Sequence, residues 1–169
     1  VSGADMGKFT YNPPAGFEGT DTFTYTLSDN PNVTSVASNR TATVSITVSG
    51  MIWFINNTDL GSSPDGRLTN PFKTLAAFQA VNNGTGNNPA ANDNIFVYES
   101  GTDYVGPVTL LNGQKFIGQD ATASLSAISG ITPAQGSDPL PTTTPGAPIV
   151  NITSAGTGIN LGQNNTLRG

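Results

Sequence analysis

Hydrophobic and polar residues alternate along three runs within the first fifty positions of the chain. The runs cover residues 7–11, 21–28 and 40–48, and each places apolar side chains at every second position. A period of two predicts antiparallel strands with one buried face and one face in water. Residues 12–16 and 29–32 are rich in Asn and Pro, which favour turns between strands.

A different pattern follows these fifty positions. Residues 51–55 are continuously apolar, which predicts a strand buried on both faces. Residues 70–81 carry an apolar stripe at helical spacing and predict the only helix of the chain. Asn70 suits the N-cap and Pro71 the first helical position, while the Asn and Gly residues at 82–84 would end the helix.

The remainder of the chain consists of short apolar runs separated by Gly, Asn and Asp. The runs cover residues 95–98, 108–111, 115–117, 127–128, 149–152, 158–161 and 166–168. Short strands at close spacing indicate the coils of a solenoid. Residues 111–118 resemble residues 160–169, about 50 positions later, which supports a repeat. Residues 131–148 are rich in Pro, Thr and Gly, so we expect them to loop out of a coil.

The composition limits the classes of function. The formal charge is −5 with 6 Lys and Arg residues, which argues against binding to nucleic acid or to an anionic membrane surface. The chain has no Cys, so disulfides, zinc–thiolate sites and cysteine nucleophiles are excluded. It has no His, the usual general base at neutral pH. No apolar run is long enough to predict a membrane span.

One family resemblance rests on a string of spaced residues near the beginning of the chain. The string contains Gly7, Phe9, Tyr11, Gly16, Phe17, Gly19, Asp21, Phe23, Tyr25 and Asp29. It resembles the C-terminal half of the bacterial cadherin-like and Ig-like tandem repeats of giant surface proteins. The resemblance implies that residues 1–49 are part of an Ig-like β-sandwich.

A second resemblance covers the rest of the chain. The order is the 51–55 strand, a Pro64-Asp65-Gly66 loop, the 70–81 helix, the 93–98 strand and the Leu111 to Gly118 motif. It is similar to the N-terminal cap and first coils of right-handed parallel β-helix proteins of the pectate-lyase-like superfamily. The resemblance implies that the helix closes the open end of the β-helix.

The expected fold is therefore all-β. A partial Ig-like or cadherin-like β-sandwich at residues 1–49 precedes a right-handed parallel β-helix at 50–169, which has one short capping α-helix. Both segments break off within a pattern, so we expect a stretch of a longer, modular extracellular protein.

Two acidic residues are candidates for calcium, which is the only cofactor that the sequence leaves open. Asp21 and Asp29 resemble acidic positions near calcium in some cadherin-like modules. The alternative is that Asp21 caps a turn and Asp29 starts one, because calcium requires six or more oxygen ligands.

Two tyrosines are candidates for carbohydrate contact on a β-helix face. They are Tyr98 and Tyr104, and the alternative for each is packing or anchoring of a turn. Trp53 is expected in the core of the first strand. The other acidic residues have no paired spacing, and no catalytic residue, phosphate loop or metal cluster is predicted.

These observations predict a non-enzymatic role. We expect a structural or adhesive segment of a large, secreted bacterial cell-surface protein or filament. Its expected partners are neighbouring domains, identical subunits or surface polysaccharide. The alternatives are a non-catalytic N-terminal part of a β-helix polysaccharide lyase or hydrolase, and a carbohydrate-binding module.

Overall fold

The computed structural model describes residues 9–27, 40–146 and 150–169. The chain divides into two compact units, one of residues 17–50 and the other of residues 51–169 with the segment before residue 17. Strands far exceed helices among the described residues, so the prediction of a mainly β chain is confirmed.

The smaller unit contains a two-stranded antiparallel sheet. Strand β1 (Gly19–Leu27) pairs with β2 (Arg40–Val48), and Phe23 lies opposite Val44. Phe23, Tyr25 and Val44 lie on one face of the pair and Thr and Ser on the other, as the period of two predicts. The predicted burial of the first face is not found, because Phe23 and Tyr25 are 38 % and 43 % exposed. The described strands of the smaller unit form this one sheet and no second sheet that faces it. The β-sandwich therefore stays a prediction.

The third predicted strand, at residues 7–11, is not found in its described part. Residues 9–11 have no regular structure and belong to the larger unit. Side-chain bonds hold this segment, since Arg67 Nη1 donates to the carbonyl of Pro13 at 3.3 Å. Pro13 and Pro14, which follow the predicted strand, have no N–H groups to continue a strand ladder beyond residue 12.

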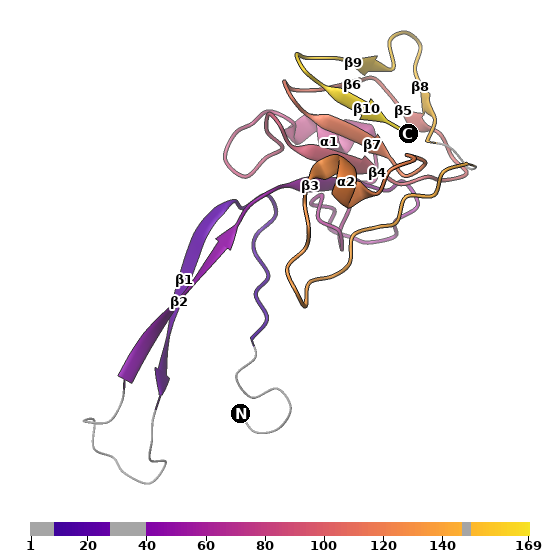
Figure 1. The fold of residues 1–169 in the computed structure, drawn as a ribbon. Helices are drawn as coiled ribbons and strands as arrows, with labels where there is room; N and C mark the ends of the chain where they lie inside the picture. Colours follow the sequence, from indigo (N-terminus) through magenta and orange to yellow (C-terminus); the bar gives the residue numbers. More distant parts are fainter. Residues whose placement is uncertain (1–8, 28–39, 147–149) are drawn as a thin grey trace. The chain divides into compact units, whose positions relative to one another are not determined.

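The larger unit is built from parallel strands in three sheets (Figure 1). The first sheet has the order β10-β7-β4-β3, and the other two are the pairs β5-β8 and β6-β9. The bounds are β3 (Ile52–Ile55), β4 (Asn94–Val97), β5 (Tyr104–Val105), β6 (Val108–Thr109), β7 (Lys115–Gly118), β8 (Ile152–Thr153), β9 (Ile159–Asn160) and β10 (Thr166–Arg168).

The chain visits these three sheets twice in the same order. It passes through β4, β5 and β6, then through β7, β8 and β9, and returns to the first sheet at β10. Asn94 pairs with Lys115, 21 positions later, and Lys115 pairs with Thr166, 51 positions later. The second passage is longer because it contains the helix α2 (Leu125–Ser129) and residues 131–146, which have no helix or strand.

The helices differ from the prediction in position and in number. Helix α1 is Leu75–Val81, and its N-cap is Thr74, whose hydroxyl accepts from the Ala77 N–H at 3.0 Å. The predicted N-cap Asn70 instead forms a β-bridge with Arg67, and Phe72 is bridged to Ile55, so the chain is extended there.

Helix α2 was not predicted, so the expectation of a single helix is wrong for the described residues. Ala127 and Ile128 lie inside it, so the strand predicted at 127–128 is wrong. Ser124 is its N-cap and Gly130 its left-handed C-cap.

Alternate residues of the main sheet enter two different cores. On one face, Trp53, Ile95 and Phe116 are aligned across three strands and pack with Leu75 and Phe78 of α1. On the opposite face the aligned residues are Phe54, Phe96 and Ile117, which pack with Leu125 of α2. Burial on both faces accounts for the continuously apolar sequence of β3.

Candidate functional site

Asp21 lies inside a strand, so the turn role considered for it is wrong. It is the third residue of β1 and pairs with Ile46, and its Oδ1 accepts from the Thr22 N–H at 2.8 Å. Asp29 lies outside the described residues. Within the described part of the chain, no group of three or more acidic, Cys or His residues could hold a metal ion.

The side-chain hydroxyl of Tyr104 joins the two candidate tyrosines by a bond to the backbone of Tyr98. The Tyr104 hydroxyl donates to the Tyr98 carbonyl at 2.7 Å and accepts from the Asn57 N–H at 3.3 Å. Tyr104 is 2 % exposed, and the half-buried ring of Tyr98 packs edge-on against Phe96 with centroids 5.1 Å apart. Tyr104 therefore anchors a turn, and carbohydrate contact through these rings stays a prediction.

Burial changes the acidity of both phenols. Desolvation raises the pKa of Tyr98 above its usual value of 10.0. It raises the pKa of Tyr104 as well, while the hydrogen bond from the Asn57 backbone acts in the opposite direction. Both groups are protonated at neutral pH.

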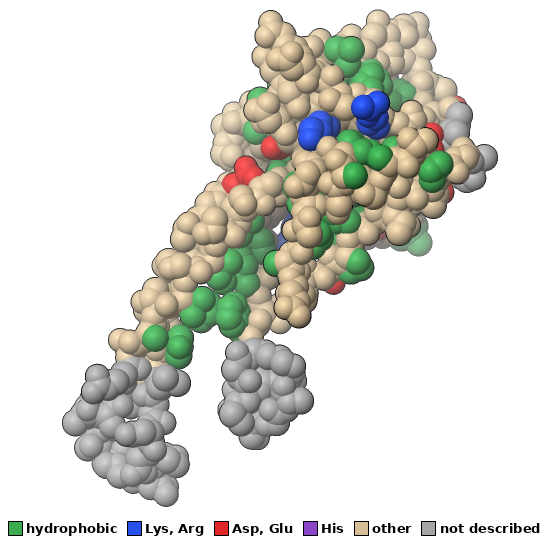
Figure 2. Space-filling model, viewed as in Figure 1, with side chains coloured by type: hydrophobic (Ala, Val, Ile, Leu, Met, Phe, Trp, Pro, Cys, Tyr) green, Lys and Arg blue, Asp and Glu red, His purple; other side chains and the backbone are tan. Residues whose placement is uncertain are grey.

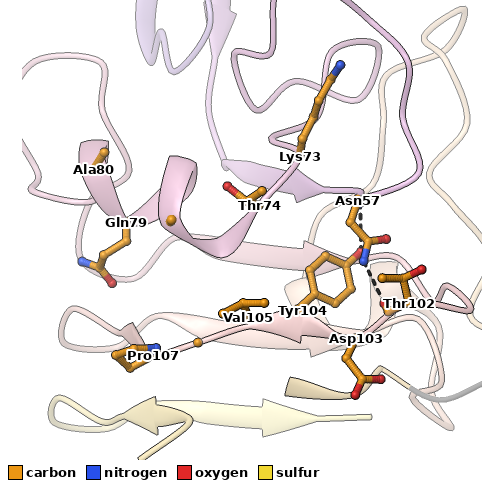
Figure 3. A pocket seen from close by; sticks show the side chains of 12 residues that line it. Asn57, Lys73, Thr74, Gln79, Ala80, Thr102, Asp103, Tyr104, Val105 and Pro107 are labelled. Carbon is orange, nitrogen blue, oxygen red and sulfur yellow. Dashed lines mark hydrogen bonds between the residues drawn. The ribbon is translucent and has the colours of Figure 1, made fainter. Parts of the chain in front are cut away.

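A cleft of about 730 Å³ opens beside Tyr104, between α1 and β5 (Figure 3). Its apolar lining includes Ala76, Ala80, Val105 and Pro107. Asn57, Thr102 and Tyr104 lie together at one end in Figure 3, where Asn57 Nδ2 donates to the Thr102 carbonyl at 2.8 Å.

Two charged residues, Lys73 and Asp103, also line this cleft. Arg67 forms an ion pair with Asp65, whereas no ion pair joins Lys73 to Asp103 among the described residues. The combination of small apolar walls with separate charges suits non-covalent binding. Sequence reasoning missed the cleft, although Ala76 and Ala80, one helical turn apart, mark a face of α1 without bulky side chains.

A second hollow of about 550 Å³ lies over β7 and β10 beside α2. Figure 2 shows basic side chains on this face, next to hydrophobic ones. Lys115 Nζ donates to the carbonyl of Ile128 at 2.8 Å, at the C-terminal end of α2. Lys115 thus ties the helix to the sheet and stabilises the negative end of the helix dipole.

Comparison with known families identifies only the beginning of the chain. Residues 1–49 match the family model of a bacterial Ig domain. The match includes β1 and β2, covers less than a third of the chain, and bears out the predicted Ig-like repeat of bacterial type. It indicates a surface or structural role for the bacterial Ig domain.

No curated protein and no solved structure shows significant similarity to this chain. The comparisons therefore give no support to the β-helix resemblance of the second segment. Neither of the helices described has the length and apolar character that crossing a membrane requires.

Proposed function

We propose that this chain is a structural and adhesive segment of a large bacterial extracellular surface protein or filament, with no catalysis of its own. The bacterial Ig domain supports the surface location, because such domains are typically surface-exposed. Neighbouring domains, identical subunits or surface polysaccharide would be its partners.

We further propose that residues 50–169 are the N-terminal cap and first turns of a right-handed parallel β-helix. The observation that carries this proposal is the repeated passage through three parallel sheets in one order, with in-register pairing between successive turns. A right-handed crossover is the strongly preferred connection between parallel strands.

Stacked turns of this kind would resist bending and pulling. The turns that begin at β4 and β7 are joined by backbone hydrogen bonds in three sheets, and the aligned core residues Trp53, Ile95 and Phe116 connect β3, β4 and β7. Separation of two turns must break these contacts together, so a stack of turns behaves as a stiff rod. A stiff rod next to an Ig-like repeat suits display at a distance from the cell.

Antibodies raised against the purified chain would test this function on intact cells of the source bacterium. We expect labelling of intact cells, and we expect brief treatment with an external protease to remove it. Labelling that requires lysis and survives external protease would contradict the proposal.

A further inference from the structure

Helix α1 lies against two strand edges at the same end of the stacked turns (Figure 1). In the described part of the chain, β5 pairs only with β8 and β6 only with β9. Each of these two strands therefore has a second edge that faces away from its partner, and α1 lies near both edges. The helix forms side-chain hydrogen bonds with the edge of β6 but, among the described residues, none with the edge of β5.

Side chains of α1 and its C-cap seal the edge of β6. The Thr109 N–H donates to Gln79 Oε1 at 2.6 Å, and the Thr109 carbonyl accepts from Asn82 Nδ2 at 2.9 Å. Asn82 is held in place by the buried Gln114, whose Nε2 donates to Asn82 Oδ1 at 2.7 Å. These side-chain amides replace the neighbouring strand that β6 lacks.

The edge of β5 has no such seal. Its Tyr104 and Gly106 N–H groups donate toward β8, to the carbonyls of Asn151 and Thr153 at 2.9 and 2.8 Å. Alternation along a strand directs the N–H and C=O of Val105 to the other side, into the cleft. There α1 presents Ala76 and Ala80, which have no polar side-chain atoms.

The open edge is accessible as well as unpaired. The Val105 side chain is 73 % exposed, and no hydrogen bond of its backbone to another described residue lies on the cleft side. The free edge is short, because Pro107 follows and has no N–H to continue a ladder.

We propose that this cleft binds a short extended peptide segment of a partner protein, which adds a strand to the edge of β5. The N–H and C=O of Val105 need an acceptor and a donor at the spacing that one peptide residue provides. One residue of an antiparallel strand can therefore form both hydrogen bonds with Val105. The adjacent side chains would pack on Ala76, Ala80 and Pro107. Lys73 and Asp103 offer opposite charges for polar ends of the segment. This binding goes beyond the structural role proposed above.

The test uses the full chain labelled with ¹⁵N and the blocked peptide acetyl-Thr-Val-Thr-amide as the probe. We expect the amide signal of Val105 to shift in a saturable manner. The same peptide with a methylated central nitrogen lacks the donor, so it should bind roughly tenfold more weakly. Equal binding of the two peptides, or no saturable shift at Val105, would overturn the proposal.

A matched pair of variants tests the position of the site. Ala76→Gln puts a side-chain amide over the edge of β5 and should weaken binding roughly tenfold or more. Ala127→Gln makes the same change on the exposed surface of α2 and should leave binding unchanged. Equal binding to both variants would overturn the assignment, as would a Val105 shift produced by N-acetylglucosamine but not by the peptide.

Discussion

At the scale of single residues, one carboxylate joins β3 to the turn that precedes β4. Asp93 Oδ2 accepts from Trp53 Nε1 at 2.8 Å and from the Ala90 N–H at 2.7 Å. The apolar run at 51–55 predicts Trp53 in the core, and the residue is found there with 3 % exposure. The bond between residues 40 positions apart is not predictable from the sequence, because it depends on how β3 and β4 pair.

Removal of this carboxylate should destabilise the larger unit. Asp93→Ala leaves a part-buried indole N–H without its partner, and we expect a loss of about 2 kcal/mol in the free energy of unfolding. Urea unfolding followed by Trp53 fluorescence measures the loss. Asp138→Ala, at an exposed position, is the control and should change little. Equal effects of the two substitutions would contradict this role of Asp93.

The buried phenols predict a loss of stability in alkali. Burial raises the pKa of Tyr98 and Tyr104, so the folded chain keeps protons that the unfolded chain releases above the usual value of 10.0. The folded state binds more protons than the unfolded state above pH 10, so it is disfavoured as the pH rises. The free energy of unfolding therefore keeps its full contribution from these groups below pH 10 and declines above it. Urea unfolding between about pH 9 and about pH 11 should show the decline.

Tyr104→Phe should make this alkaline decline smaller. The variant has one buried phenol fewer, although it loses the bond to the Tyr98 carbonyl, which should cost about 1 kcal/mol near neutral pH. An alkaline decline as steep as that of the unchanged chain would show that Tyr104 does not contribute to it.

At the scale of elements, the strands that carry a strong pattern were predictable from the sequence. The alternating run at 40–48 is β2, and the apolar run at 51–55 contains β3. Two-residue strands such as β5 have no periodicity to detect. The beginning of α1 was missed because Asn70 and Thr74 are both suitable N-caps, and the bridge of Phe72 to Ile55 decides between them.

The junction between α1 and β7 gives a prediction at this scale. Asn82 is 5 % exposed, and its side chain bonds to both Gln114 and the Thr109 carbonyl. Asn82→Ala removes the bond to the Thr109 carbonyl and the bonds between Asn82 and the buried Gln114 amide, and we expect a loss of about 2 kcal/mol in the free energy of unfolding. Asn87→Ala, at an exposed position of the following loop, is the control in the same urea experiment. A loss no larger than that of the control would contradict the sealing role of Asn82.

At the scale of the whole molecule, successive turns of unequal length keep one register. The repeat between residues 111–118 and 160–169 was visible in the sequence because both stretches lead into strands of the main sheet. The turn from β4 to β7 is 30 residues shorter than the turn from β7 to β10, so no constant period was available to align the remaining strands. The cleft was unpredictable for the same reason, since it depends on which strand edge lies beneath α1.

The stacking of turns in register is the central claim, and disulfide pairing tests it most directly. The chain has no Cys of its own, and Thr109 pairs with Asn160 while Val105 pairs with Thr153. Cysteines at either pair should form a disulfide on mild oxidation, because paired positions of neighbouring strands lie within the required distance.

The crossed pairs provide the control at the same four positions. Cysteines at Thr109 with Thr153, or at Val105 with Asn160, should stay reduced, because four residues along the chain separate the two sites by more than a disulfide spans. The bond from Thr109 to Asn160 should also stabilise the chain by up to about 4 kcal/mol. Disulfides that form as readily in the crossed pairs as in the aligned pairs would contradict the register and, with it, the stacked turns.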